Sequence, residues 1–185
     1  MTRVLLGVTG GVGAFKAVLL LRLLRKSGFD VRVLLTESAA HFVGRPTFHA
    51  LSGAPVYDNL WALDRSRSGE LHVELSSWAD AMVIYPATAN CIGGLAAGLA
   101  DDLLKLTVSC FGGPVVLCPA MHSRRAEHPG VEAATAALAQ RGVRVLEPVE
   151  GELASGEHGR GRLREPEDAL EALRAALAPA DLAGH

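Results

Sequence analysis

The stretch over residues 4–16, VLLGVTGGVGAFK, constrains the fold more than any other part of the chain. A short apolar run over residues 4–8 enters a glycine cluster at residues 10–13, and an amphipathic segment then extends to Ser27. This order predicts a buried strand, a tight turn and a helix. Such a turn directs backbone N–H groups and a helix N-terminus at one point, which favours an anion, typically a phosphate. The spacing is that of neither a dinucleotide Gly-x-Gly-x-x-Gly motif nor a Walker A loop, so a glycine turn that binds nothing is also compatible with it.

Short apolar runs recur along the chain with helix-like segments between them. The predicted strands cover residues 4–8, 31–36, 81–86, 114–119 and 143–146, and the predicted helices cover residues 14–27, 38–52, 89–100, 103–110, 129–141 and 166–178. Continuous apolar strands that alternate with helices indicate a parallel sheet covered on both faces. We therefore expect a single domain over residues 1–185 with a three-layer, Rossmann-like (flavodoxin-like) α/β fold and a mainly parallel sheet.

Composition narrows the classes of partner. A net charge of -2 over 185 residues offers no basic field for nucleic acid or for a membrane surface, and no apolar run is long enough to span a bilayer. The N-terminus does not resemble a signal peptide, so we expect a cytoplasmic protein. The histidines lack metal-site spacing, so no metal is expected. We expect Cys91, Cys110 and Cys118 to be buried as small apolar residues.

Polar residues follow several of the predicted strands directly. Thr36 and Ser38 follow the second strand, Thr88 and Asn90 follow the third, and a Pro-Ala-Met-His segment ending at His122 follows the fourth. The carboxyl ends of parallel strands share one edge of the sheet, and ligands bind there. Each hydroxyl or amide is also a good helix cap, so the gathering of these residues at one edge is the informative feature.

Two polar stretches do not fit the sheet pattern. Residues 59–71 are expected to form a mobile loop, and the residues after 179 a frayed tail. Residues 151–164, GELASGEHGRGRLR, are glycine-rich and basic. We expect either a flap that closes over an anionic substrate or a flexible surface connection, and composition leaves both open.

Seven motifs in order carry a resemblance to a known family. They read GVTGGVGAFK, TESA, HVELSSWAD, PATANCI, AAGLADDLL, PAM followed by HP, and GELASGEHGRGRL. Together they cover about residues 3–166, and the chain resembles the flavin-dependent cysteine decarboxylases. That family includes phosphopantothenoylcysteine decarboxylase of coenzyme A biosynthesis and the peptidyl-cysteine decarboxylases that modify peptide C-termini.

The resemblance implies FMN as the phosphorylated cofactor. It places the phosphate on Gly10, Gly11 and Val12, with hydroxyl contacts from Thr36 and Ser38. It assigns further cofactor contacts to Pro86, Thr88, Ala89, Asp102 and Met121. It also implies a flavin site between subunits, and hence a homo-trimer or homo-dodecamer.

The implied chemistry begins with oxidation of the substrate's Cβ–S unit to a thioaldehyde. The C=S group then accepts electrons as carbon dioxide leaves, and an enethiolate remains. A lone histidine is usually structural or solvated, but His72 matches the family histidine thought to act as base. The resemblance places Asn90, Arg160 and Arg162 at the substrate, where the arginines, with Arg164, suit a phosphate or a carboxylate.

Two residues depart from the family pattern. His122 stands where the family usually has an asparagine that helps hold the substrate carboxylate. Histidine can also donate a hydrogen bond there, and the alternative is a changed substrate or lost activity. Ser155 stands where phosphopantothenoylcysteine decarboxylases carry a cysteine thought to protonate the enethiol, a step for which a serine hydroxyl is far too weak an acid.

The departure at Ser155 favours a reaction that stops at the enethiol. We therefore expect oxidative decarboxylation of a peptide C-terminal cysteine to an aminoenethiol, slightly ahead of phosphopantothenoylcysteine decarboxylation. Two further hypotheses are an FMN-binding homologue without decarboxylase activity and a protein similar to flavin prenyltransferases. His72 and the PATAN and PAM segments favour the decarboxylases over both.

Overall fold

The computed structural model describes residues 1–61 and 70–178. Its centre is a six-stranded sheet of order β3-β2-β1-β4-β5-β6 in which every neighbouring pair is parallel. The strands are β1 (Arg3–Val8), β2 (Asp30–Leu35), β3 (Val56–Tyr57), β4 (Ala81–Ala87), β5 (Val115–Pro119) and β6 (Arg144–Val145). A separate antiparallel hairpin pairs β7 (Val149–Glu152) with β8 (His158–Arg162).

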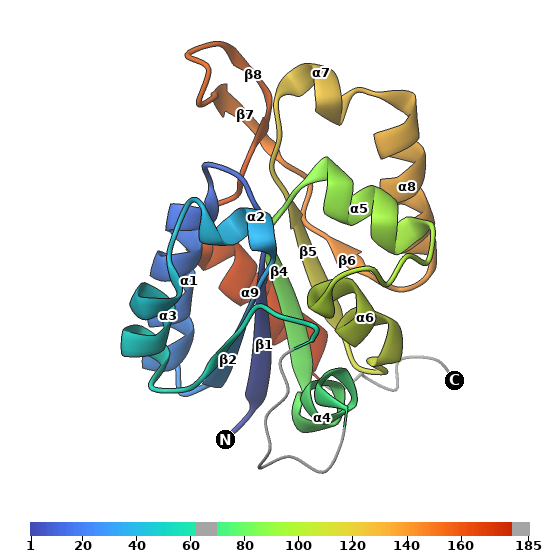
Figure 1. Cartoon of the computed structure of the whole chain (residues 1–185). Helices are drawn as coiled ribbons and strands as arrows, with labels where there is room; N and C mark the ends of the chain where they lie inside the picture. The colour runs from blue at the N-terminus through green and yellow to red at the C-terminus, as the bar shows by residue number, and fades with distance from the viewer. Residues whose placement is uncertain (62–69, 179–185) are drawn as a thin grey trace, which may run out of the picture.

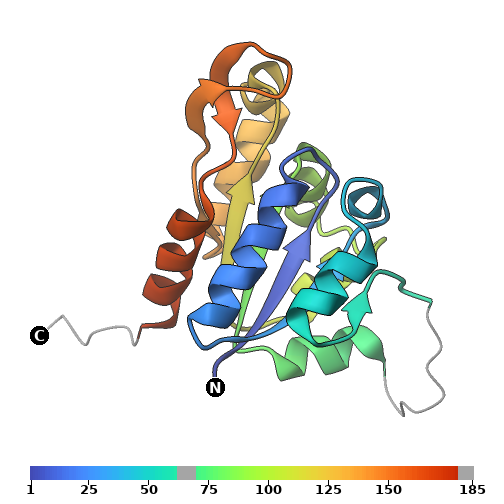
Figure 2. The same cartoon turned by 90° about the vertical axis from the view of Figure 1, so that its left-hand side faces the viewer.

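Helices cover both faces of the sheet (Figure 1). One face carries α1 (Ala14–Lys26), α3 (Arg45–Ser52) and α9 (Pro166–Leu177), with the short α2 (Glu37–Ala40) near its edge. The other face carries α4 (Leu71–Trp78), α5 (Ala89–Ala96), α6 (Leu103–Cys110) and α8 (Pro129–Gln140). The short α7 (Ser123–Ala126) lies beside the hairpin (Figure 2). The predicted α/β fold with a mainly parallel sheet is confirmed.

Successive side chains of β1 point to opposite faces of the sheet and contribute to two separate hydrophobic cores. Val4, Leu6 and Val8 are fully buried in the core that α1, α3 and α9 close, whereas Leu5 is buried in the core on the opposite face. A strand buried on both faces must be apolar at successive positions, which is why this run reads as continuous apolar sequence. The sheet therefore has a fixed register, and its strands end together at one edge. We call the edge formed by the ends of β1, β2, β4 and β5 the carboxyl edge.

The single predicted helix over residues 38–52 is wrong. The structure divides it into α2 and α3, and Gly44 is the N-cap residue of the second helix. Pro46 lies in the first turn of α3, where a proline needs no N–H partner; inside a continuous helix it would remove a hydrogen bond. The break keeps α2 as one short turn directly after β2.

The glycine-rich stretch at residues 151–164 is also more ordered than its composition indicates. It forms most of the β7–β8 hairpin, which stands beyond the carboxyl edge (Figure 1). Leu153 N donates to Glu157 O across the turn at 2.8 Å. The hairpin is mostly exposed and lacks an apolar face, so it gives no strand signal in the sequence.

The burial of the cysteines was predicted correctly for two of the three. Cys91 and Cys118 are buried as predicted, but Cys110 is exposed at the end of α6, so that prediction is wrong for Cys110. No helix within residues 1–61 and 70–178 has the length and apolar character needed to cross a membrane. Most of the loop predicted at residues 59–71, and the tail after residue 179, lie outside the described residues.

Candidate active site

The glycine turn, residues 10–13, joins β1 to α1 at the carboxyl edge. Within the described part of the chain, the backbone N–H groups of these four residues donate to no protein acceptor. A Cβ on Gly10 would collide with Ser38, so the turn lies directly against the start of α2. At Gly11 the nearest atom to a Cβ would be Thr88 Cγ2 at 3.8 Å, which leaves this side of the turn open. The turn therefore presents free donors toward open space, as an anion site requires.

Thr36 and Ser38 lie next to this turn but have different roles. Thr36 is the N-cap of α2: its Oγ1 accepts from Ala39 N at 3.2 Å, and its own N–H donates to Val8 O at 3.1 Å. Ser38 is exposed, and its hydroxyl has no partner among the residues described. Ser38 is therefore free to donate to an anion held by the glycine turn, while Thr36 fixes the helix start.

Thr9 ties the ends of β1 and β4 together and was missed by the sequence analysis. Its side chain is 1% exposed, and its Oγ1 donates to Pro86 O at 2.7 Å and accepts from Thr88 N at 3.0 Å. Thr88 in turn caps α5 by accepting from Cys91 N at 3.4 Å. The sequence feature that could have pointed to Thr9 is its place as a hydroxyl residue between an apolar strand and a glycine cluster. These bonds bring Pro86 and Thr88 beside the glycine turn.

Ala89 and Asn90 start α5 at the same edge. Ala89 is 9% exposed, whereas Asn90 is exposed and its amide has no partner within the described residues. An unengaged amide at the carboxyl edge can donate to or accept from a bound ligand.

Asp102 belongs to a different local network. It is the N-cap of α6, where its Oδ1 accepts from Lys105 N at 2.8 Å. The Lys105 ammonium is 3% exposed and pairs with Asp101 at 2.7 Å and with Asp102 Oδ2 at 3.2 Å. Burial opposes the charge on Lys105, but the two carboxylates outweigh it and raise its pKa. Both Asp102 oxygens are thus engaged inside the chain, which leaves the predicted cofactor role for Asp102 as a prediction.

Met121 and His122 connect β5 to the hairpin. Met121 N donates to Gly161 O at 3.0 Å, and Gly161 has a φ of 141°, where a Cβ would collide with the Met121 carbonyl. His122 caps α7 through Nδ1, which accepts from Arg124 N at 3.3 Å, and its Nε2 lies 2.6 Å from Glu157 Oε2. The predicted substrate residue His122 therefore lies against the tip of the hairpin.

Ser155 lies in the exposed turn of the hairpin. Its Oγ accepts from Glu157 N at 3.4 Å, so Ser155 and the partner of His122 share one turn. Two of the three cysteines are buried, and burial raises the pKa of Cys91 to about 12 and also raises the pKa of Cys118. Cys110 lies on α6. The hairpin itself carries no thiol acid.

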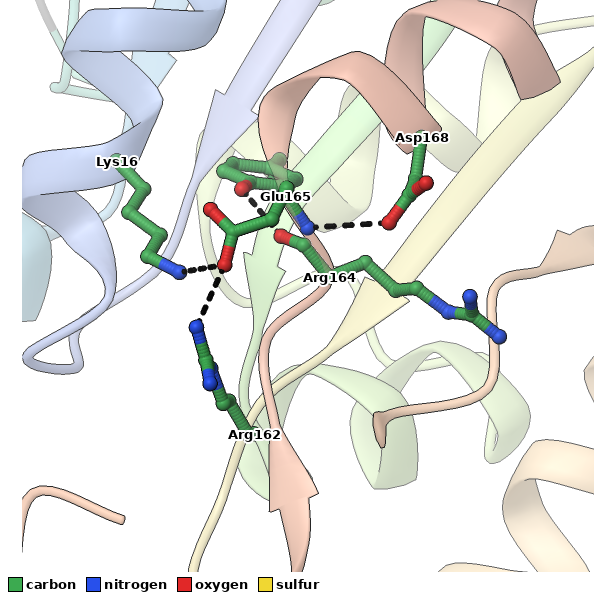
Figure 3. A network of polar contacts seen from close by, with 6 residues as sticks. Lys16, Arg162, Arg164, Glu165 and Asp168 are labelled. Atoms are coloured by element: carbon green, nitrogen blue, oxygen red, sulfur yellow. Dashed lines mark hydrogen bonds and ion pairs between the residues drawn. The ribbon is translucent and has the colours of Figure 1, made fainter. Parts of the chain in front are cut away.

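The predicted substrate arginines are paired with carboxylates of the same chain. Arg160 donates to Glu147 at 2.8 Å, and Arg162 donates to Glu165 at 2.9 Å. Glu165 also accepts from Lys16 Nζ of α1 at 2.8 Å (Figure 3). The bond from Lys16, together with Arg162, holds the pKa of Glu165 below its usual value. The pairs at Glu165 join the base of the hairpin to α1 and to the start of α9, and the Arg160 pair joins it to the segment between β6 and β7.

His72 is not brought to the glycine turn by this chain. It lies on α4, which both views place toward the amino ends of the strands, away from the turn (Figures 1 and 2). Its Nε2 is 3.2 Å from Glu70 Oε2. A hollow of about 690 Å³ is lined by Glu37 and Ala40 of α2 and by Leu71 at the start of α4. The catalytic role of His72 therefore stays a prediction.

Comparisons with known proteins find relatives that match nearly the whole chain. The family model described as Flavoprotein matches residues 1–178. The coenzyme A biosynthesis bifunctional protein CoaBC of Bacillus subtilis is 42% identical over 168 residues, which are 91% of this chain and 41% of that protein. The chain therefore spans less than half the length of the curated relatives that it matches.

Two solved structures resemble the whole fold. A cysteine-to-serine variant of PPC decarboxylase, complexed with pantothenoylaminoethenethiol, matches with a TM-score of 0.85 and 30% identity and covers 94% of this chain and 97% of that one. The FMN-dependent cysteine decarboxylase SpaF matches with a TM-score of 0.84 and 28% identity and covers 96% of this chain and 98% of that one.

Proposed function

The chain belongs to the flavoprotein family, and from this premise we propose that it is an FMN-dependent decarboxylase of a cysteine carboxyl group. The observation that carries the proposal is the set of free N–H donors of residues 10–13, which lie beside Ser38 and Thr88. The expected assembly is a homo-trimer or homo-dodecamer in the cytoplasm, without a nucleic-acid or membrane partner.

The residues of the carboxyl edge fit FMN. The phosphate would be held by the N–H groups of Gly10, Gly11 and Val12 and by the Ser38 hydroxyl, because these donors are unengaged within the described chain. A side chain at Gly10 would abolish the close approach of the turn to α2. Pro86, Thr88, Ala89 and Met121 would line the rest of the cofactor. When bound, FMN supplies a two-electron acceptor for the oxidation of a thiol.

The protein's own side chains then have separate tasks. His122 presents an Nε2–H to the substrate carboxylate and positions it for loss as carbon dioxide. His72 of a neighbouring subunit removes the thiol proton, which raises the electron density on sulfur and carbon before oxidation. Asn90 and the hairpin arginines orient the rest of the substrate and exclude water when the hairpin lies over it.

We propose phosphopantothenoylcysteine as the substrate. The comparisons support this substrate more strongly than the peptide favoured by the sequence analysis, because CoaBC proteins match 91–98% of the chain at 42% identity. A peptide ending in cysteine is the second candidate substrate. The FMN-dependent cysteine decarboxylase SpaF matches the fold with a TM-score of 0.84, against 0.85 for the PPC decarboxylase variant.

Ser155 sets the proposed end of the reaction. Because the hairpin offers a hydroxyl instead of a thiol, the enethiol is not protonated there. The substrate then loses carbon dioxide and two hydrogens, and the two electrons pass to an outside oxidant such as oxygen. The product is an aminoenethiol.

The proposal is tested by spectrum and mass. The purified protein should carry an FMN absorption spectrum, and phosphopantothenoylcysteine should lose carbon dioxide and two hydrogens on incubation in air. Turnover of a cysteine-ended peptide alone would replace the substrate proposal, and a protein that cannot be loaded with FMN would contradict the whole proposal.

A further inference from the structure

The base and the tip of the β7–β8 hairpin are held in different ways. Several bonds fix the base, among them Met121 N to Gly161 O at 3.0 Å and Arg160 to Glu147 at 2.8 Å. The tip, residues 153–157, has internal turn bonds such as Gly156 N to Leu153 O. Among the described residues, one hydrogen bond joins the tip to the body, and it is the 2.6 Å contact between His122 Nε2 and Glu157. The tip can therefore move if this contact is exchanged for another.

The ring of His122 leaves a single donor for this contact. Its Nδ1 accepts from Arg124 N, so a neutral ring carries its proton on Nε2. The Nε2–H donates to the Glu157 carboxylate, and a donor bound to a carboxylate makes a short, charge-assisted bond. The Glu157 side chain is 64% exposed, so the contact is of the surface type that another carboxylate can displace.

We propose that Glu157 occupies the same Nε2–H of His122 that the substrate carboxylate uses, so that Glu157 and the substrate carboxylate compete for it. The inference rests on the proposed function, which assigns the substrate carboxylate to His122. Displacement of Glu157 by the substrate frees the tip to close over the substrate. After decarboxylation the product has no carboxylate to compete for this donor, and Glu157 returns to His122.

Glu157 is thus a specificity-determining and positioning residue: it lowers affinity for the carboxylated ligand and leaves affinity for the decarboxylated one unchanged. Two ligands without a thiol separate these effects in the FMN-loaded protein. The first is 4′-phosphopantothenoylserine, which keeps the carboxylate, and the second is the corresponding ethanolamine amide, which lacks it. Neither ligand has a thiol that FMN could oxidise, so no reaction takes place and calorimetry measures binding alone.

In Glu157→Gln we expect affinity for the serine ligand to rise about threefold, the size of an exposed charge effect, and affinity for the amide to stay unchanged. Glu152→Gln is the matched control, because Glu152 is an exposed carboxylate on the same hairpin and has no contact with His122. It should change neither affinity. In a His122→Ala background, Glu157→Gln should no longer alter the ratio of the two affinities.

Weaker binding of the serine ligand in Glu157→Gln, or equal changes for both ligands, would overturn the proposal. Hydrogen exchange without ligand tests the contact independently: amides of residues 153–157 should exchange faster in Glu157→Gln than in Glu152→Gln, and equal rates would also overturn it. If neither ligand binds the wild-type holoprotein while exchange behaves as expected, the substrate of the proposed function is wrong and the peptide pair, ending in serine or in ethanolamide, takes its place.

Discussion

The carboxyl edge and the β7–β8 hairpin are built in opposite ways. At the edge, Thr9 is 1% exposed and the free donors belong to the backbone of residues 10–13. At the hairpin tip, the Glu157 side chain is 64% exposed, and within the described part of the chain it bonds to one side chain, that of His122. Backbone donors come with the fold, whereas exposed side chains can be exchanged without loss of the fold. The edge therefore indicates the cofactor, and the hairpin distinguishes reactions that share that cofactor.

The largest effect on FMN binding is expected at Gly10, where an added methyl group would collide with Ser38. We expect Gly10→Ala to bind FMN at least about tenfold more weakly, because overpacking displaces α2 from the turn. Flavin fluorescence titration measures this. Gly112→Ala is the control, since among the described residues no atom lies within 4 Å of a Cβ there and Gly112 lies outside the glycine turn. Equal losses in the two variants would contradict the assignment of the close contact to Gly10.

Variants of His72 test whether one chain alone supplies all the residues of the active site at the carboxyl edge. We expect His72→Asn to lose about a hundredfold or more in turnover and to keep its FMN spectrum, because the residue lies on α4, away from the glycine turn. Subunits of His72→Asn and Gly10→Ala, mixed and reassembled, should regain part of the activity. Without such recovery, a site shared between subunits would be excluded.

A smaller effect is expected at Thr9. Thr9→Val keeps the shape but removes the bonds to Pro86 O and Thr88 N, and we expect the free energy of unfolding to fall by about 1–3 kcal/mol. Chemical denaturation of the apoprotein measures this. Thr9→Ser retains the hydroxyl and should lose much less. A larger loss in Thr9→Ser than in Thr9→Val would show that the methyl group, and not the hydroxyl, stabilises the edge.

The smallest effect concerns Glu165 at the hairpin base. Lys16 and Arg162 lower its pKa, so this carboxylate contributes stability above its ordinary pKa of 4.5 and loses it as the pH falls through the lowered value. The side chain is 48% exposed, which keeps the contribution small. Lys16→Met should flatten the decline of Tm just below pH 4.5, and an unchanged decline would exclude the pair as its cause.

The sequence was sufficient to predict five of the six strands of the sheet and most of its helices, because strands buried on both faces are mostly apolar. The two-residue strand β3 and the helix α4 were not predicted. The sequence also located the glycine turn, because a residue without a Cβ is needed where the turn approaches Ser38 closely. Within the edge, Thr9 was missed because a threonine after a strand has no unique signal until its partners, Pro86 and Thr88, are known to be adjacent.

The hairpin was harder to predict for a physical reason. Its strands are held by backbone pairing and by ion pairs such as Arg160 with Glu147, which leave no apolar periodicity in the sequence. The contact between His122 and Glu157 joins residues 35 positions apart, so neither residue indicates the other. The position of His72 on α4 likewise depends on how the helix packs and not on its local sequence.

Anaerobic turnover of Ser155→Cys beside the wild type tests whether the hairpin decides how the reaction ends. With phosphopantothenoylcysteine and no oxidant, the wild type should form one enethiol per FMN, leave the flavin reduced and stop. Ser155→Cys should continue for many turnovers, release the saturated thiol and return the flavin to its oxidised form, because a thiol can protonate the enethiol. Repeated anaerobic turnover by the wild type, with loss of carbon dioxide alone, would show that Ser155 does not stop the reaction at the enethiol.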